Sequence, residues 1–230
     1  MAARLVPTGM TVPIRRGPLR GRKWIVGAAA GEGKGLSVIL NRAEPEQMRQ
    51  ARRLVSPDSI CFDIGANVGL YTLLFARYAR HVYAFEPWPR NVRFLSRLLE
   101  INRVPNATIV PWAVSATTEF ASFQAGSNCA TGKLSRQGKQ PVAAISCDNF
   151  VATYNVVPSL LKIDVEGAEL AVLQGAANLL TQQRPDILLS THGADIKDSC
   201  LTYLRQLGYN RMEALDSDDI DTAADFMIRS

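Results

Sequence analysis

The sequence has few of the residues that build metal centres, disulfide frameworks and membrane spans. Its 230 residues include 4 cysteines and 2 histidines, and no two cysteines form a CxxC pair. This excludes zinc ribbons, small disulfide frameworks and histidine-rich metal sites, and favours a reducing compartment. No run reaches the ~18 apolar residues of a membrane helix, and residues 1–25 lack the apolar segment of a secretory signal. We therefore expect a soluble, cytoplasmic protein.

Aromatic residues are also sparse, at 7% of the chain, and positive charge is unevenly distributed. Residues 1–53 contain 11 lysines and arginines against 3 acidic residues, whereas residues 54–230 contain 15 against 18. Because Trp24 is the only aromatic residue in this basic segment, it lacks the stacking surface that single-stranded nucleic acid requires. We predict that residues 1–53 form a basic N-terminal arm packed on the core and that residues 54–230 form one domain, and nucleic acid is not the partner that we expect first.

From residue 59 onward, short apolar runs alternate with helical patterns. The predicted strands are 59–64, 81–85, 107–112, 160–163 and 186–190, and the predicted helices are 68–79, 89–102, 147–155, 168–180 and 197–207. This alternation is typical of an α/β fold in which helices cover both faces of a mainly parallel sheet. Residues 113–146 interrupt the pattern and predict a β-hairpin insertion with its tip near 126–138, and 211–215 and 225–228 predict a closing antiparallel pair.

The sharpest motif is Asp63-Ile64-Gly65-Ala66-Asn67-Val68-Gly69, at a predicted strand-to-helix junction. Gly65 permits a tight turn and close approach by a ligand, and Gly69 permits the helix to pack on its strand. The NAD fingerprint GxGxxG fails, because Asn67 stands where its second glycine belongs. Glu86 ends the next strand, 21 residues after Gly65, where a carboxylate can accept hydrogen bonds from both ribose hydroxyls. This combination predicts a nucleoside ligand without bridging phosphates, such as S-adenosylmethionine.

A second group of candidate residues follows two later strands. Asp164 ends a strand, Glu166 occupies the next turn, and Glu169 begins a helix whose dipole favours an acid there. We expect Asp164 and Glu166 to face the same cleft as Gly65, where they could orient an acceptor hydroxyl, contact a cofactor ammonium group or hold a divalent ion. His192 follows another strand, and its ordinary pKa of about 6.5 makes it the candidate general base. His192, Asp164 and Glu166 are thus the predicted catalytic residues, and no residue is assigned to a metal.

Three motifs in this order resemble the FkbM family of S-adenosylmethionine-dependent methyltransferases. They are Cys61-Phe62-Asp63-Ile64-Gly65-Ala66-Asn67-Val68-Gly69, Ala84-Phe85-Glu86-Pro87 and Leu161-Lys162-Ile163-Asp164-Val165-Glu166-Gly167-Ala168-Glu169. The resemblance implies the class I methyltransferase fold, a Rossmann-like three-layer sandwich with a mostly parallel seven-stranded sheet. It also implies transfer of a methyl group to a hydroxyl of a carbohydrate, glycosylated or polyketide-type metabolite.

The resemblance further implies a set of cofactor-binding residues. The glycine-rich turn would frame the methionine and ribose, Glu86 would bind the ribose hydroxyls, and the residues after the third strand would lie along the adenine. The residues assigned to the cofactor are Asp63, Gly65, Ala66, Asn67, Gly69, Glu86, Pro87, Ala113, Val114 and Asp164.

Two other functions stay open at this point. The basic arm would suit an RNA ribose methyltransferase, and a catalytically silent cofactor-binding domain would carry the same motifs. The proline-aromatic motif typical of methyltransferases that act on nucleic-acid amino groups is missing after Asp164. We therefore expect a small-molecule or glycan acceptor.

Overall fold

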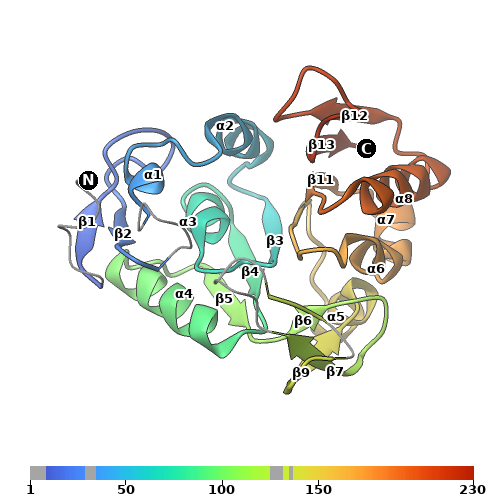
Figure 1. The fold of residues 1–230 in the computed structure, drawn as a ribbon, viewed down its shortest axis with the longest axis horizontal. Coiled ribbons are helices and arrows are strands. Elements are labelled where there is room, and N and C mark those ends of the chain that lie inside the picture. The colour runs from blue at the N-terminus through green and yellow to red at the C-terminus, as the bar shows by residue number, and fades with distance from the viewer. Residues whose placement is uncertain (1–8, 29–34, 125–131, 135–136) are drawn as a thin grey trace.

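The computed structural model describes residues 9–28, 35–124, 132–134 and 137–230. The centre of the fold is a seven-stranded sheet (Figure 1). The strand order is β12-β13-β11-β10-β3-β4-β5. The run from β11 to β5 is parallel, and β13 pairs antiparallel with both β11 and β12. The predicted mostly parallel sheet and the closing antiparallel pair are confirmed. The strands are β3 (Ile60–Ile64), β4 (His81–Phe85), β5 (Ala107–Val110), β10 (Leu160–Ile163), β11 (Asp186–Ser190), β12 (Arg211–Ala214) and β13 (Asp225–Arg229).

Helices cover both faces of this sheet and complete the three layers. The helices on one side are α2 (Pro45–Leu54), α3 (Leu70–Ala76) and α4 (Pro89–Ile101), and those on the other are α5 (Cys147–Tyr154), α6 (Glu169–Gln174), α7 (Ala177–Gln182) and α8 (Ala194–Gln206). All four residues of β10 are buried, as a central parallel strand requires. Among the described residues no helix is long and apolar enough to cross a bilayer.

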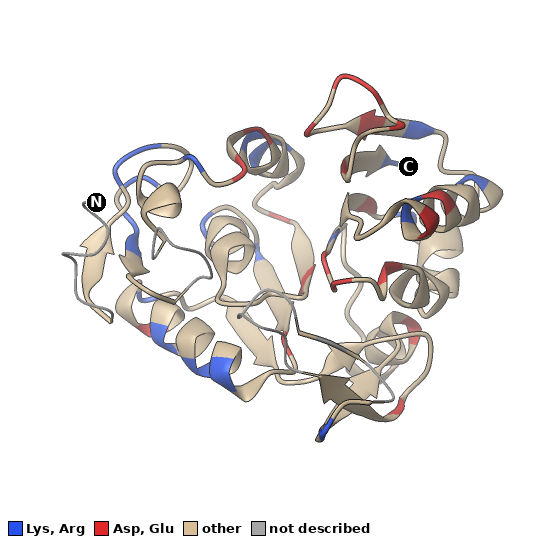
Figure 2. Cartoon of the chain, viewed as in Figure 1, with Lys and Arg blue, Asp and Glu red and all other residues tan. Residues whose placement is uncertain are grey.

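The described part of the basic N-terminal segment packs against α3 and α4. It contains a two-stranded antiparallel sheet, β1 (Thr11–Pro13) and β2 (Lys23–Ile25), and a short helix, α1 (Leu36–Ile39). Trp24 is 1% exposed and belongs to the same apolar cluster as the buried residues of α3. The side chain of Asn102 accepts a hydrogen bond from the Lys23 amide (2.7 Å) and donates one to the Lys23 carbonyl (2.9 Å). Lysines and arginines gather on this segment and along α4 (Figure 2).

The predicted hairpin insertion is a small sheet of its own. Its strands are β6 (Ala113–Val114), β7 (Glu119–Gln124), β8 (Lys133–Leu134) and β9 (Gln140–Ile145), in the order β6-β9-β7-β8. The antiparallel β7–β9 pair is the hairpin that the sequence predicts. Much of its predicted tip, 125–131 and 135–136, lies outside the described residues.

The predicted helix over 168–180 is wrong in one respect, because it divides into α6 and α7 at Gly175. A side chain at Gly175 would lie 2.1 Å from the Ser115 carbonyl oxygen of the insertion. The Gly175 carbonyl also accepts a hydrogen bond from the Asp148 amide. The chain therefore bends where it meets the insertion, a tertiary contact that helical periodicity does not register.

Several other predicted boundaries shift by one to three residues. Helix α3 begins at Leu70 rather than residue 68, because Gly69 has a φ of 98° and caps it in a left-handed conformation. Strand β5 ends at Val110 instead of residue 112, and α8 begins at Ala194, three residues before the predicted start.

The glycine turn after β3 lies against the end of the neighbouring strand β10. Gly65 has a φ of +80°, and a Cβ there would be 1.8 Å from the Asp164 carbonyl oxygen. Both the left-handed conformation and the contact with neighbouring backbone therefore exclude a side chain. Glycine at this position lets the turn after β3 and the loop after β10 lie side by side.

We expect Gly65→Ala to lower the free energy of unfolding by roughly 3 kcal/mol or more, because backbone strain and a clash with rigid backbone act together. Gly21→Ala is the matched control. Gly21 has a similar φ of +87° but nothing within 4 Å of the added Cβ, so only the conformational cost of about 1–2 kcal/mol applies. Equilibrium urea unfolding measures both, and equal losses would show that the contact with Asp164 is unimportant.

Candidate functional site

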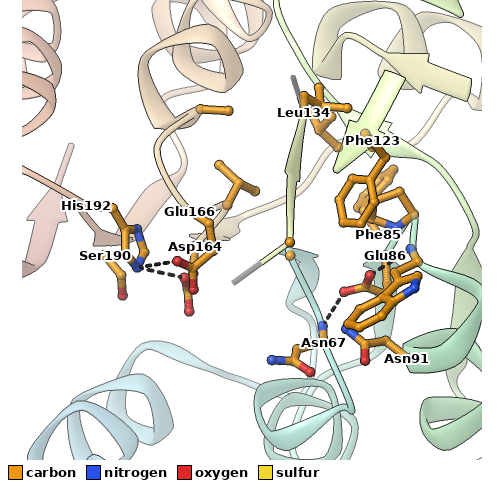
Figure 3. A pocket seen from close by; sticks show the side chains of 18 of the residues that line it. Asn67, Phe85, Glu86, Asn91, Phe123, Leu134, Asp164, Glu166, Ser190 and His192 are labelled. Carbon is orange, nitrogen blue, oxygen red and sulfur yellow. Dashed lines mark hydrogen bonds and ion pairs between the residues drawn. The ribbon is translucent and has the colours of Figure 1, made fainter. Parts of the chain in front are cut away.

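A pocket of about 460 Å³ opens at the carboxyl ends of β3, β4, β10 and β11. Ligands of open α/β sheets bind at this edge. The pocket has two chemically different ends, one where Glu86 lies beside the aromatic ring of Phe123 and one where His192 lies beside Asp164 and Glu166 (Figure 3). The predicted site residues that line it are Gly65, Asn67, Glu86, Pro87, Ala113, Val114, Asp164, Glu166 and His192.

Three residues assigned to the cofactor, Asp63, Ala66 and Gly69, are not among the pocket-lining residues. Asp63 is fully buried on β3 and accepts a hydrogen bond from Thr72 of α3. A side chain at Gly69 would lie 2.5 Å from Leu95 of α4, so its absence permits close helix packing. Asp63 and Gly69 thus fix the turn through contacts with α3 and α4 on the side away from the pocket.

Glu86 is held rigidly in the pocket wall. Its Oε2 accepts a hydrogen bond from the Asn67 amide and its Oε1 one from the Trp88 amide, each at 2.8 Å. The side chain of Asn91 donates a further hydrogen bond to this carboxylate, and an ionised carboxylate has about four acceptor positions, so it can still accept a hydrogen bond from a ligand. Asn67 has a φ of 51°, a conformation that asparagine tolerates in turns, and its buried Oδ1 has no partner among the described residues.

Beside Glu86 lies an apolar wall that sequence reasoning missed. The rings of Trp88 and Phe123 are 6.4 Å apart, and Phe123 and Leu134 reach the pocket from the insertion. Together with Val114, they offer the apolar surface against which a purine ring packs. No periodicity in the sequence associates β7 and β8 with the sheet edge, because the contact is long-range.

The acidic end brings together three residues from two strand ends. Nε2 of His192 lies 3.7 Å from Asp164 Oδ1 and 3.6 Å from Glu166 Oε2 (Figure 3). Nδ1 of His192 is hydrogen bonded to Oε1 of Glu169 at 2.8 Å. The sequence predicts that Asp164, Glu166 and His192 belong to one site. For Glu169 it predicts only a favourable interaction with the helix dipole.

Glu169 also shapes the loop that carries Glu166. Its Oε1 accepts hydrogen bonds from the amides of Gly167 (3.0 Å) and Val165 (3.3 Å). Glu166 and Gly167 both have positive φ, 57° and 102°. A non-glycine residue in this conformation costs of order 1–3 kcal/mol, and such strain is found where surrounding structure enforces it. The Glu169 carboxylate thus holds both the loop and the imidazole ring.

The three carboxylates change the protonation of His192. The hydrogen bond to Glu169 is the largest cause that raises the pKa of His192 to about 9, and Asp164 and Glu166 raise it further against the opposing effect of burial. The expectation of an ordinary pKa is therefore wrong. With this raised pKa, the imidazole ring of His192 is protonated at neutral pH. A general base must be neutral to accept a proton.

A buried lysine lies beneath this end of the pocket. Lys162 of β10 is 5% exposed and donates a hydrogen bond to Asp164 Oδ2 at 3.0 Å. Burial lowers the pKa of Lys162, but Asp164 and Asp63 outweigh it and the pKa is raised. Lys162 is therefore a permanent cation that balances the charge of one carboxylate. By binding Oδ2 of Asp164, it leaves Oδ1 of Asp164 on the side of His192.

Two further acids reach the pocket from outside the predicted motifs. Glu44 comes from the N-terminal segment and accepts a hydrogen bond from Tyr71 at 2.7 Å, and Asp225 begins β13 and accepts one from Gln47 at 2.8 Å. Neither has a recognisable local motif, so the sequence offers no signal for them.

Burial raises the pKa of Glu86 from 4.5 to about 7. Between these values the unfolded chain releases a proton that the folded protein retains, so the folded state loses stability as pH rises. The free energy of unfolding of the wild type minus that of Glu86→Gln should therefore fall by roughly 2–3 kcal/mol from pH 5 to pH 8. Urea unfolding at several pH values measures this difference. Glu213→Gln, at an exposed site, should show a constant difference, and a constant difference for Glu86→Gln would contradict the buried carboxyl.

Comparison with known proteins places this geometry in a family. The methyltransferase FkbM domain matches residues 63–211. The hexuronic acid methyltransferase AglP of Haloferax volcanii is 32% identical over 163 residues, which cover 68% of this chain and 66% of AglP. The chain thus spans just under two thirds of the length of this relative.

Solved structures share the fold at low sequence identity. The methyltransferase FkbM from Methylobacillus flagellatus has a TM-score of 0.57 at 17% identity, covering 89% of this chain and 56% of that one. SMU.1697c, a putative methyltransferase from Streptococcus mutans solved in complex with SAH, has a TM-score of 0.50 at 14% identity, covering 79% and 94%. The predicted class I methyltransferase fold is confirmed, and the chain belongs to the FkbM methyltransferase domain family.

Proposed function

We propose that this protein is an S-adenosylmethionine-dependent O-methyltransferase that methylates a hydroxyl group of a carbohydrate. One observation carries the proposal: a single pocket joins a nucleoside-type end at Glu86 to an acidic end at Asp164, Glu166 and His192. The 32% identity to a hexuronic acid methyltransferase supports a sugar as the acceptor class.

The residues at the Glu86 end fit the proposed methyl donor. The Glu86 carboxylate lines the pocket and keeps an acceptor position for a ribose hydroxyl, and Trp88, Phe123 and Val114 form an apolar wall for the adenine. The donor supplies an electrophilic methyl group on a positively charged sulfur. The acidic residues that line the pocket suit this positive charge.

At the acidic end, the residues present are those that an acceptor hydroxyl needs. Among the described residues, no hydrogen-bond donor contacts the Glu166 carboxylate, so an oxygen is available for the proton of the hydroxyl. The acceptor oxygen forms the new bond to the methyl carbon, the sulfur–carbon bond breaks with its electron pair on sulfur, and the hydroxyl proton passes to Glu166. Asp164 and His192 position the acceptor. Alignment of these groups supplies much of the rate.

The charges of the pocket argue against an RNA acceptor. Glu44, Asp164, Glu166 and Asp225 line it, and a phosphodiester chain needs lysines and arginines along its path. The lysines and arginines of the N-terminal segment and α4 gather away from the acidic loop (Figure 2). A catalytically silent domain would bind the donor without turnover, which the following experiment detects.

The experiment incubates the purified protein with S-adenosylmethionine carrying a labelled methyl group and a panel of acceptors. The panel includes free hexuronic acids, neutral methyl glycosides and an RNA oligonucleotide. We expect label on a sugar, in a product that resists mild base, as a methyl ether does. A base-labile methyl ester would contradict the hydroxyl assignment. Label on RNA alone, or donor binding without label on any acceptor, would overturn the proposed function.

Glu86→Ala should weaken S-adenosylhomocysteine binding roughly tenfold to hundredfold, because hydrogen bonds to a charged group contribute about 1.5–3 kcal/mol each. Isothermal titration calorimetry measures the affinity, and circular dichroism confirms the fold. Glu213→Gln, on the exposed face of β12, should bind like the wild type. Unchanged affinity for Glu86→Ala would remove Glu86 from the donor site.

Glu166→Gln keeps the shape of the side chain but cannot accept the proton. We expect kcat to fall about 10²–10⁴-fold while S-adenosylhomocysteine affinity changes little. Steady-state kinetics with the sugar identified above, beside Glu213→Gln, provides the measurement. Wild-type kcat in Glu166→Gln would show that this carboxylate takes no part in the reaction.

A further inference from the structure

Three potential ligand atoms converge at the acidic end of the pocket without touching one another. Asp164, Glu166 and His192 each offer one ligand atom, and the three atoms lie within 4.8 Å of one another. Nε2 of His192 is 3.7 Å from Asp164 Oδ1 and 3.6 Å from Glu166 Oε2, beyond hydrogen-bond distance. Two neighbouring ligands about 2.1 Å from a metal ion are separated by ~3.0 Å at the roughly 90° of an octahedral site and by ~3.4 Å at the roughly 110° of a tetrahedral site. The two distances from Nε2 exceed these separations by roughly 0.2–0.7 Å, so a small inward movement of the side chains would bring them to coordination distance.

The groups behind these atoms are arranged as they are in metal sites. Glu169 binds Nδ1 of His192 at 2.8 Å, which leaves the Nε2 lone pair of the neutral ring directed at the two carboxylates. A histidine that ligates a metal almost always donates its other N–H to a carboxylate or carbonyl in this way. Lys162 binds Oδ2 of Asp164 and leaves Oδ1 on the side of His192.

Negative charge exceeds positive charge at this place. Asp164, Glu166 and Glu169 contribute three carboxylates, against Lys162 and the protonated ring of His192. Glu169 is fully buried, and its Oε2 has no hydrogen-bond partner among the described residues. Buried carboxylates are found paired or coordinating a metal, and a bound divalent cation would balance the remaining negative charge of this group.

We infer that Asp164, Glu166 and His192 bind one divalent cation at the acidic end of the pocket, with Glu169 holding the histidine ligand in place. Carboxylate oxygens suit Mg²⁺ and Mn²⁺, and the imidazole favours a transition metal. The mixed donor set therefore fits Mn²⁺ best among the ions that prefer oxygen. Three protein ligands leave coordination positions toward the pocket.

The role of the cation rests on the proposed function, whereas its binding does not. In an O-methyltransferase, an acceptor oxygen would occupy an open position beside Glu166, and the ion would favour loss of its proton as a Lewis acid. His192 would then be a ligand, which removes the need for a neutral imidazole as the general base.

The test is direct binding of Mn²⁺ to the full chain after chelator treatment, by electron paramagnetic resonance of free Mn²⁺ and by calorimetry. We expect saturable binding of about one ion per chain. Mg²⁺ and Zn²⁺ serve as competitors in separate titrations, and displacement of Mn²⁺ by either would still support the site. A protein that binds S-adenosylhomocysteine but shows no saturable Mn²⁺ binding would overturn it.

Variants assign the ion to these residues. Asp164→Asn, Glu166→Gln and His192→Ala should each abolish or strongly weaken Mn²⁺ binding, and Glu169→Gln should weaken it about 10–100-fold as an outer-shell partner. Asp225→Asn is the matched control, because it removes a pocket charge without removing a ligand, and it should retain most of the affinity. S-adenosylhomocysteine titration confirms that each variant is folded. Equal effects from Asp225→Asn and Asp164→Asn would show only general attraction of cations and overturn the site.

Activity separates this inference from the proposed function. Loss of methylation in excess chelator, with recovery on adding Mn²⁺, would support both. Full methylation by metal-free protein, together with the absence of Mn²⁺ binding, would overturn the cation site and leave the O-methyltransferase in place. Saturable Mn²⁺ binding that depends on the three ligands, with no acceptor methylated, would support the site while the proposed function fails.

Discussion

The close contact between the turn after β3 and the end of β10 is the constraint on which the site depends. Gly65 lies against the Asp164 carbonyl, and only the lack of a side chain permits this approach. The two strands are parallel neighbours in the sheet. Consequently the turn that carries Asn67 and the loop that carries Glu166 leave the sheet at the same edge. One pocket can therefore combine the end that carries Glu86 with the acidic end.

The site is built at a cost in stability that the surrounding core offsets. Glu86 is a buried carboxyl group with a raised pKa, and Glu166 has a left-handed backbone conformation. Both features are unfavourable in an apo protein. They persist because rigid neighbours hold them: backbone amides bind Glu86, and the fully buried Glu169 carboxylate binds the loop around Glu166. Local violations of folding rules are expected where a sequence is selected for function.

The alternating core and half of the site could be predicted from the sequence because both depend on short-range patterns. Glycine spacing identified the turn at Gly65, and the distance to the next strand end identified Glu86. The strand-end positions of Asp164 and His192 placed them at one edge. The protonation of His192 could not be predicted, because it depends on Glu169, whose carboxylate reaches the ring from another element.

Long-range packing accounts for the other failures of prediction. Gly175 divides a regular helical pattern because the Ser115 carbonyl lies against it, and no local signal marks that contact. Glu44 and Phe123 enter the pocket from the N-terminal segment and the insertion, which lack the strand-helix alternation. Their sequences carry no motif, since side chains that close a pocket need only suitable size and charge.

The division of the pocket between core and additions has a chemical consequence. Asn67, Glu86, Asp164 and Glu166 all follow strands of the central sheet, so the groups that we propose to bind the donor and to accept the proton are fixed by the fold itself. Glu44, Phe123 and Leu134 come from segments packed onto that fold. Changes in those segments can reshape the pocket opening without moving the strand ends. The proposed reacting groups are thereby separated from the surfaces that can contact an acceptor, so one sheet edge can serve acceptors of different shape.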